Sequence, residues 1–241
     1  MQIANSVAVV TGGASGLGQG VADLLTRLGA HFEVYDLQGD TKVDVTSAAE
    51  VEAAFNATIA HHKKVDIVVH CAGIGYAGRM LPKEGGPMPL DVFERVIHVN
   101  LIGTFNVSRL AAAAMAKNSP GEDGERGVIV NTSSVAAYDG QIGQVPYAAA
   151  KAAVAGMTLP MARELAKLGI RVMAIAPGLF HTPLLSALPT EAMQQLTSGI
   201  PFPARLGTPA EFASLARHII ENRYLNGEVI RLDGSLRMPP K

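Results

Sequence analysis

Short segments rich in β-branched and other apolar residues alternate along the chain with longer segments whose apolar residues recur at helical spacing. Segments that are apolar on both faces indicate buried parallel strands, because a parallel sheet carries helices on either side. We therefore predict an α/β fold built from βαβ units. The expected strands lie within residues 7–12, 31–36, 65–73, 127–134 and 170–178. The expected helices lie at about residues 16–29, 47–62, 91–117, 147–168 and 209–222.

No linker divides these elements into separate units. The polar segment 121–127 is expected to form a turn, and the chain has neither an internal repeat nor a low-complexity tail. A length of 241 residues would accommodate two small domains, but α/β proteins of this size are often a single domain. We expect one domain that spans residues 1–241.

Composition favours an assembly of several chains. Apolar residues make up 48% of the sequence and charged residues only 17%, whereas a charged share of about 25% is usual. Much apolar surface must therefore be buried in a large core or between subunits, and we expect an oligomer. The net charge of −1 gives no sign of the broad basic surface that binds nucleic acids, so no nucleic-acid partner is expected.

Cysteine usage and the N-terminal segment bear on the compartment. Cys71 is the only cysteine, so no internal disulfide can form, and the scattered histidines complete no recognisable zinc spacing. The N-terminal segment has no basic stretch followed by a long apolar one, as a signal peptide or membrane span would. We expect a cytoplasmic protein in a reducing environment, with no membrane partner and no metal site.

The first segment that suggests chemistry is the loop TGGASGLG, from Thr11 to Gly18, between a predicted strand and a predicted helix. Gly12, Gly16 and Gly18 have no side chains to hold a pyrophosphate away from the backbone. The helix N-terminus behind them presents unpaired N–H groups to an anion. Taken alone, the loop would be better interpreted as an ordinary tight turn between a strand and a helix.

Asp36 ends the second predicted strand, eighteen residues after Gly18. A carboxylate there can accept hydrogen bonds from an adenosine ribose and would repel a 2′-phosphate, which favours NAD over NADP. A capping or solvated aspartate is the alternative. Asp44 and Val45, further on, could meet the adenine. Only seven residues separate Asp36 from Asp44, so no full crossover helix fits between them.

The segment VPYAAAK places Tyr147 and Lys151 four residues apart, on one face of a predicted helix. Tyrosine is a poor base at neutral pH because its ordinary pKa is about 10. An ammonium about 4–5 Å away, at an effective dielectric near 20, supplies about 3–4 kcal/mol, enough to lower that pKa by about two to three units. We predict that Lys151 makes Tyr147 a usable acid/base. A core tyrosine beside a lysine with a buried stem is the structural alternative.

Ser134 stands thirteen residues before Tyr147, at the end of the predicted strand 127–134. That position lies at the carboxyl edge of the sheet, where ligands bind in open α/β folds. Its hydroxyl could hold a substrate oxygen against the tyrosine, and Ser133 is the competing choice. The glycine loop, the acidic strand end and the serine, tyrosine and lysine in this order form a specific set.

This set resembles that of the short-chain dehydrogenase/reductase family, and the resemblance covers essentially the whole chain. It implies a Rossmann-type, doubly wound sheet of seven parallel strands with helices on both faces, in one NAD(P)-binding domain. It implies that Ser134, Tyr147 and Lys151 are catalytic and that Asn100 props a proton-relay water against the lysine. The cofactor contacts implied for NAD are Thr11, Gly12, Ser15, Gly16, Leu17, Gly18, Asp36, Asp44, Val45, Cys71, Ala72, Gly73, Tyr147, Lys151, Pro177, Gly178, Phe180 and Thr182.

One segment departs from the family pattern, which has two asparagines where this chain has His70 and Cys71. The backbone role of Ala72 and Gly73, which follow, can survive this change. His70 must find other partners, and we expect a satisfied strand histidine in preference to a catalyst.

A closer similarity within the family narrows the substrate. Segments such as GIRVMAIAPGLFHTPLL and LNGEVIRLDG resemble members that form homotetramers and oxidise the 3-hydroxyl of short or branched 3-hydroxyacyl-CoA thioesters, with some also accepting steroids. Two alternatives remain: an NAD-dependent dehydrogenase of a hydroxysteroid or other free alcohol, and an NAD-binding scaffold or sensor. Segments 78–90 and 179–207 are expected where a substrate lid would lie.

Overall fold

A parallel sheet of six strands, in the order β2-β1-β3-β4-β5-β6, forms the centre of the computed structural model, which describes residues 1–38, 42–183 and 197–240. The strands span Val7–Thr11 (β1), His31–Tyr35 (β2), Ile67–His70 (β3), Gly127–Thr132 (β4), Ile170–Pro177 (β5) and Val229–Leu232 (β6). The first five confirm the predicted strands. β6 was not among the segments that the apolar pattern singled out.

The predicted helices are found within a few residues of their expected ends. They span Gly16–Arg27 (α1), Ala48–His62 (α2), Leu90–Ile97 (α3), Gly103–Met115 (α4), Val145–Leu165 (α5) and Pro209–Glu221 (α8). The predicted helix at 91–117 is α3 and α4 joined by a π-helical turn, His98–Ile102. Short 3-10 segments are Glu122–Gly124, Val135–Ala137 and Ala166–Leu168.

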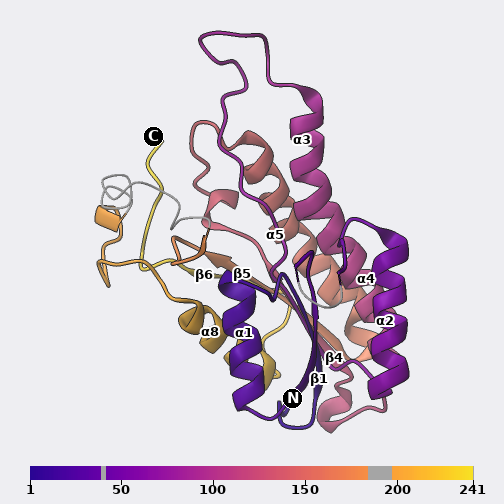
Figure 1. The fold of residues 1–241 in the computed structure, drawn as a ribbon. Helices are drawn as coiled ribbons and strands as arrows, with labels where there is room; N and C mark the ends of the chain where they lie inside the picture. Colours follow the sequence, from indigo (N-terminus) through magenta and orange to yellow (C-terminus); the bar gives the residue numbers. More distant parts are fainter. Residues whose placement is uncertain (39–41, 184–196, 241) are drawn as a thin grey trace.

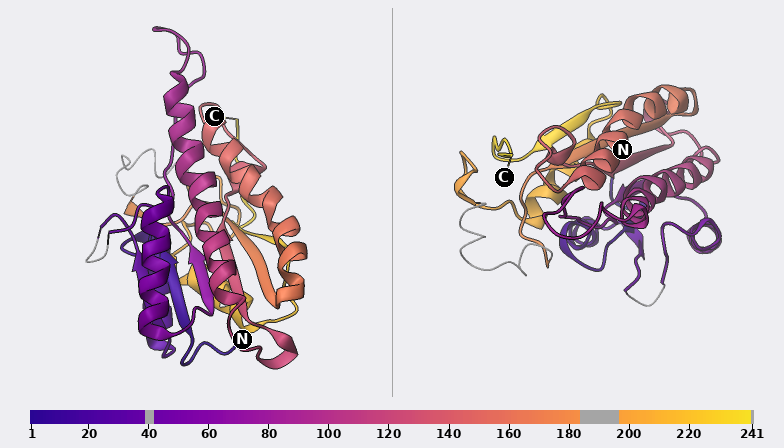
Figure 2. Two further views of the ribbon diagram at one scale, coloured as in Figure 1. Left: turned by 90° about the vertical axis from the view of Figure 1, so that its right-hand side faces the viewer. Right: turned by 90° about the horizontal axis from the view of Figure 1, so that it is seen from above.

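Helices cover both faces of the sheet (Figure 1). One face packs against α1 and α8, which contribute Val21, Leu25 and Phe212 to its core. The other packs against α2, α4 and α5, which lie side by side in the left view of Figure 2. Burying a large aliphatic side chain stabilises a fold by about 1.5–3 kcal/mol, and the central strands are buried along their whole length. The two apolar layers therefore hold the doubly wound arrangement together.

The expectation of seven strands is wrong for the part of the chain that the structure describes. Beyond β2, at the edge of the sheet, a single parallel bridge joins Asp36 to Lys42. The short connection after Asp36 explains the difference, since it leaves room for one bridge where a further edge strand would pair.

Local sequence fixes where several helices begin. Ser47 caps α2 by accepting from the Glu50 N–H. Thr208 and Glu211 form a reciprocal capping box at the start of α8. Pro146 stands in the first turn of α5, where its missing N–H costs nothing. α5 therefore begins at Val145, after the 3-10 turn Val135–Ala137 that follows Ser134.

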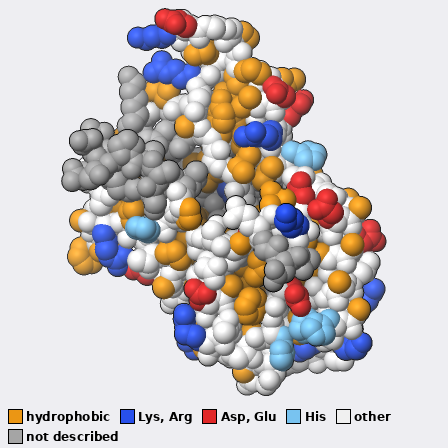
Figure 3. All heavy atoms as spheres, viewed as in Figure 1, with side chains coloured by type: hydrophobic (Ala, Val, Ile, Leu, Met, Phe, Trp, Pro, Cys, Tyr) orange, Lys and Arg blue, Asp and Glu red, His pale blue; other side chains and the backbone are white. Residues whose placement is uncertain are grey.

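The segment before α3 projects beyond the body of the molecule, past the carboxyl ends of the strands (Figures 1 and 2). It carries exposed apolar side chains, among them Met80 and Leu81. Hydrophobic side chains lie on the surface in the upper part of Figure 3. This segment contains most of the predicted lid segment 78–90. Residues 184–196 of the other predicted lid segment lie outside the described residues.

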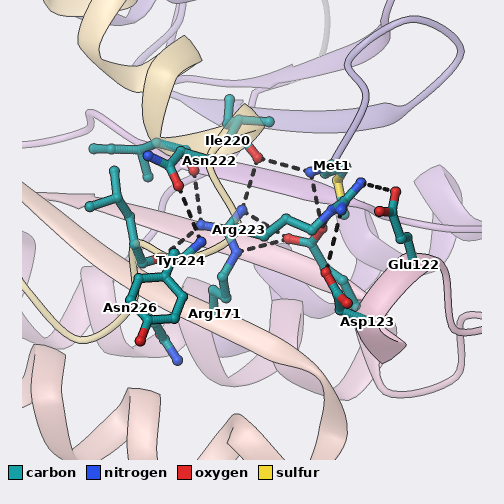
Figure 4. Close-up of polar contacts among 12 residues, drawn as sticks. Met1, Glu122, Asp123, Arg171, Ile220, Asn222, Arg223, Tyr224 and Asn226 are labelled. Atoms are coloured by element: carbon teal, nitrogen blue, oxygen red, sulfur yellow. Dashed lines mark hydrogen bonds and ion pairs between the residues drawn. The ribbon is translucent and has the colours of Figure 1, made fainter.

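The opposite, amino-terminal edge of the sheet is closed by a polar network around Arg171 at the start of β5 (Figure 4). The Arg171 guanidinium pairs with Glu125 at 2.8 Å and donates to the carbonyls of Ile219, Ile220 and Leu225. Glu125 also pairs with the Met1 amine at 3.0 Å. A buried charge is costly without partners. Arg171 has several, so the network joins β5, α8 and the chain start without an unpaired charge.

Candidate active site

Ser134 and Tyr147 meet at the carboxyl end of β4. Ser134 follows the strand and caps the 3-10 turn Val135–Ala137, where its hydroxyl accepts from the Ala136 N–H at 3.1 Å. The Tyr147 side chain, from the first turn of α5, lies near enough to the Ser134 side chain for the serine to lower the pKa of the phenol. Ser133 is buried and donates its hydroxyl to the Lys151 carbonyl at 2.8 Å. The structure therefore brings Ser134, and not the competing Ser133, to the tyrosine.

Lys151 lies one turn further along α5 and is buried, with 4% of its surface exposed. Its amine donates to the Thr132 carbonyl at 2.8 Å and lies 5.8 Å from the centre of the Tyr147 ring. The lysine is thus held between the end of β4 and the tyrosine, as the four-residue spacing predicts.

The pKa of Tyr147 differs from the prediction made from the sequence, which was that Lys151 lowers it. Burial raises the pKa of Tyr147 above its ordinary value, and the hydrogen bond with Ser134 opposes that rise. Burial lowers the pKa of Lys151 to about 8. The cost of burying a phenolate outweighs the hydrogen bond here. The chain by itself therefore does not depress the pKa of Tyr147, and a working tyrosinate needs further positive charge.

Asn100 lies in the π-helical turn between α3 and α4 and is fully buried. Its amide accepts from the Ile74 N–H at 3.1 Å and donates to the Ile74 carbonyl at 2.9 Å. A Cβ added to Gly73 would lie 2.6 Å from the Asn100 amide oxygen and 3.6 Å from the Lys151 amine. Asn100 therefore fixes the backbone beyond β3 close to the lysine, and its side-chain groups are occupied in doing so.

The glycine loop has the geometry that a dinucleotide needs. A Cβ on Gly18 would stand 2.2 Å from the Gly12 carbonyl oxygen, and one on Gly12 would stand 2.7 Å from the Ala72 N. Gly16 has a left-handed φ of 54°. No side chain caps the N-terminus of α1 at Ser15, so its first N–H groups face the loop. These residues fit a pyrophosphate at the helix N-terminus.

The segment after β5 returns to this loop. Gly178, after Pro177, donates its N–H to the Leu232 carbonyl at 2.9 Å. A Cβ on Gly16 would lie 3.5 Å from Thr182 Cγ2, so Thr182 stands over the glycine loop. Phe180 is buried, with its ring edge-on to Phe212. Any contact from Phe180 to a cofactor would therefore come from its backbone.

Asp36 lies beside the glycine loop at the end of β2. One carboxylate oxygen accepts from the Ala14 N–H and the other from the Gln38 N–H, each at 3.0 Å. A carboxylate has about four acceptor positions, so two remain for ribose hydroxyls. Asp36 thus has the capping role that was the alternative interpretation and keeps room for the ribose.

Asp44 and Val45, the residues predicted to contact the adenine, follow Asp36 along the chain. Asp44 closes a turn by accepting from the Thr46 N–H and hydroxyl. Val45 is 5% exposed, and a Cβ on Gly103 would lie 2.7 Å from its side chain. Val45 therefore contributes mainly to the core, while Asp44 is partly exposed.

His70 is fully buried at the end of β3. Its Nδ1 lies 2.9 Å from the Thr11 hydroxyl, which also accepts from the Ala72 N–H at 3.1 Å. Burial, and then the charge of Lys151, lower its pKa to about 3, so it is neutral at pH 7. Among the described residues, its Nε2 and the Asn131 amide nitrogen on neighbouring β4 have no hydrogen-bond partner. We expected both ring nitrogens of His70 to have hydrogen-bond partners, but only Nδ1 has one among the described residues.

Cys71, next to His70, has a buried thiol 3.8 Å from the Thr132 hydroxyl. Burial raises its pKa to about 12, which makes it a poor nucleophile at neutral pH. Its N–H donates to the Thr11 carbonyl at 3.0 Å. The contacts that Cys71 and Ala72 make with Thr11 are formed by their backbone N–H groups.

Sequence reasoning missed three features of the site. Thr132 anchors Lys151 through its carbonyl, and Ile74 holds Asn100 through its backbone. Both act through peptide groups, so their residue types carry no signal. The π-helical turn was also missed, because its apolar spacing continues that of the flanking helices.

Within the ranges that the structure describes, no helix is both long and apolar enough to cross a membrane.

Comparisons with known proteins give a consistent result. The family model described as short chain dehydrogenase matches residues 6–192. A 3-hydroxyacyl-CoA dehydrogenase type-2 of Bos taurus is 52% identical, over 97% of this chain and 96% of its own length. One of Drosophila melanogaster is 50% identical, over 99% and 100%. The crystal structure of a 3-hydroxyacyl-CoA dehydrogenase type-2 from Mycobacterium avium has a TM-score of 0.91 and 41% identity, and the match covers 98% of this chain and 97% of that one.

Proposed function

The chain belongs to the short-chain dehydrogenase family, and from that premise we propose that it oxidises the 3-hydroxyl of short or branched 3-hydroxyacyl-CoA thioesters with NAD. The observation that carries the proposal is the contact between Ser134 and Tyr147 beside the buried Lys151, at the carboxyl ends of the strands. The thioester substrate is supported by relatives of that name, which match this chain over nearly its whole length.

Ser134 and Tyr147 act on the substrate hydroxyl. The Ser134 side chain lies near enough to Tyr147 to lower the pKa of the phenol, so we expect the two hydroxyls to hydrogen-bond one substrate oxygen between them. Tyr147 takes the hydroxyl proton as the adjacent carbon gives up its hydride, and it protonates the alkoxide in the reverse direction. Holding the oxygen in line with the tyrosine supplies much of the rate through positioning.

The tyrosinate needs positive charge, since burial raises the pKa of Tyr147. Lys151 supplies part of this charge, since its amine lies 5.8 Å from the centre of the Tyr147 ring. A hydrogen bond to the Thr132 carbonyl holds the amine in place. NAD, when bound, supplies the hydride acceptor and a cationic ring that also favours the phenolate. Asn100 keeps the backbone beside Lys151 in place, and we propose that a water near this turn returns protons to the lysine.

Cofactor choice rests on Asp36. Its carboxylate is anchored on the N–H groups of Ala14 and Gln38, so it presents a fixed negative charge beside the glycine loop. That charge would repel a 2′-phosphate and accept hydrogen bonds from the free ribose hydroxyls of NAD. Family membership supports a nicotinamide cofactor, and Asp36 is our reason for NAD in particular.

We also propose that the protein is a homotetramer. Ile102, just before α4, is 42% exposed, Phe105 on α4 is 50% exposed, and Leu159 on α5 is 43% exposed. Both helices lie on the same face of the sheet. Exposed apolar side chains on neighbouring helices are typical of subunit interfaces.

The test of this function is NADH formation by the purified protein with four substrates. These are 3-hydroxybutyryl-CoA, 2-methyl-3-hydroxybutyryl-CoA, free 3-hydroxybutyrate and a 17β-hydroxysteroid. Strong turnover confined to the two thioesters is the expected result. Turnover of the steroid or free acid alone would keep the mechanism and replace the substrate. Tight NAD binding with no turnover of any of the four would favour the scaffold.

A further inference from the structure

Glu33, His61 and His62 form a cluster away from the active site. Glu33 lies in the middle of β2, at the edge of the sheet, and the two histidines are the last residues of α2. Oε1 of Glu33 lies 2.8 Å from Nε2 of His62 and 3.7 Å from Nδ1 of His61. Histidine side chains gather on this part of the surface in the lower right of Figure 3.

The two histidines converge in a way that neighbouring helical residues ordinarily do not. Successive residues of a helix point in different directions. Here the two rings have centroids only 4.2 Å apart, and both turn a nitrogen toward the same carboxylate. The helix ends here, since Lys63 follows directly with a left-handed φ of 72°.

A simple ion pair accounts for only part of this arrangement. The hydrogen bond between Glu33 and His62 needs no second imidazole. The ligand atoms of all three residues nevertheless lie within 4.8 Å of one another. Imidazole nitrogens and a carboxylate together are ligands that suit Zn²⁺ and its neighbours Ni²⁺ and Cu²⁺, whereas Mg²⁺ prefers oxygen alone.

We propose that Glu33, His61 and His62 bind one divalent transition-metal ion, with Zn²⁺ as the representative case. With bonds of about 2.0–2.2 Å, two ligand atoms on a tetrahedral zinc are about 3.4 Å apart. The distances from Glu33 Oε1 to His62 Nε2 (2.8 Å) and to His61 Nδ1 (3.7 Å) lie on either side of that separation. Small side-chain rotations therefore suffice to place the three ligand atoms around one ion.

Exposure of the three side chains suits entry of an ion. His61 is 75% exposed, Glu33 is 36% exposed and His62 is 14% exposed. The partly buried His62 is thus held in place, whereas the exposed His61 can rotate from solvent onto the ion. The fourth coordination position is open to water. The cluster lies at the end of α2 remote from the carboxyl edge, so the ion is a clamp between α2 and β2 and takes no part in the oxidation.

Equilibrium dialysis of chelator-treated full-length protein against Zn²⁺ tests the proposal, with Mg²⁺ as the oxygen-preferring probe. His61→Ala removes an exposed ligand without opening the core, and Glu33→Gln keeps the shape of the side chain while removing its charge. His218→Ala is the matched control, because His218 is an exposed histidine on α8, outside the cluster.

The wild-type protein and His218→Ala should bind one Zn²⁺ per chain and no Mg²⁺ at the same concentration. His61→Ala and Glu33→Gln should each bind zinc at least about tenfold more weakly, a loss of about 1.4 kcal/mol. Zinc should also raise the melting temperature of the wild type more than that of His61→Ala at the same zinc concentration. The assignment would be overturned if the wild type bound no zinc, or if His61→Ala and Glu33→Gln bound zinc as tightly as the wild type.

Discussion

Lys151 carries a buried amine that loses its proton more readily in the folded chain than in the unfolded one. Its pKa falls from 10.5 to about 8 on burial. Between these pH values the unfolded chain holds the extra proton, so the stability contributed by this group rises with pH. Relative to Lys151→Met, the wild type should gain up to roughly 3 kcal/mol in free energy of unfolding from about pH 7 to about pH 10.

Urea unfolding of both proteins at the two pH values measures this gain. Lys167→Met, a change at an exposed lysine, is the control and should show no comparable gain. A constant difference between wild type and Lys151→Met across the range would contradict the lowered pKa.

Asp36 is expected to decide between NAD and NADP. Asp36→Asn keeps the shape of the side chain and removes the charge. A hydrogen bond to a charged group contributes about 1.5–3 kcal/mol, so NAD binding should weaken by about tenfold or more while discrimination against NADP falls. Titration of both cofactors measures the ratio of their dissociation constants. An unchanged ratio would mean that another residue contacts the ribose.

At the level of single residues, the sequence predicted functional side chains but not the backbone groups that hold them in place. The spacing of Tyr147 and Lys151 predicted their common helix face, and the strand end predicted Ser134. The pKa of Tyr147 was not predictable, because it depends on how deeply the phenol is buried. The cluster of Glu33, His61 and His62 was missed since the two adjacent histidines lie 28 and 29 residues after Glu33 and match no metal spacing.

Gly18 controls how closely α1 can approach β1. A methyl group there would stand 2.2 Å from the Gly12 carbonyl oxygen, so the loop and helix would have to separate. Gly18→Ala should cost about 1–3 kcal/mol of stability and weaken dinucleotide binding by at least about tenfold. Unfolding and cofactor titration measure the two effects.

Gly86→Ala provides the comparison for this substitution. Nothing lies within 4 Å of a Cβ added at Gly86, so both measurements should stay at the wild-type values. Normal cofactor binding by Gly18→Ala would contradict the close approach of loop and helix.

At the level of whole elements, the apolar pattern predicted five strands and the main helices because buried parallel strands and amphipathic helices have distinct periods. β6 is short and half-buried, so its pattern is weak. The seventh strand came from the family resemblance, and the short connection after Asp36 leaves a single bridge in its place. The connection length was visible in the sequence, but its consequence for pairing required the structure.

The whole molecule is expected to assemble through the apolar side chains of α4 and α5. Phe105 is half exposed on α4, and a charge in its place would oppose burial between subunits. Phe105→Glu should therefore convert the tetramer to smaller species, as light scattering after gel filtration would show. Tyr224→Glu changes a fully exposed residue and should leave the assembly intact. A wild-type monomer, or an intact tetramer of Phe105→Glu, would contradict this interface.

The central claim is that Tyr147 transfers the proton during oxidation of a 3-hydroxyacyl-CoA. The most direct measurement compares NADH formation from 3-hydroxybutyryl-CoA by the wild type and by Tyr147→Phe, with NAD affinity measured for both. Phenylalanine keeps the ring and removes only the hydroxyl, so we predict rapid turnover by the wild type, a loss of at least about 100-fold in the variant, and similar NAD affinity. Near-normal turnover by Tyr147→Phe, with NAD bound as tightly as before, would contradict the account.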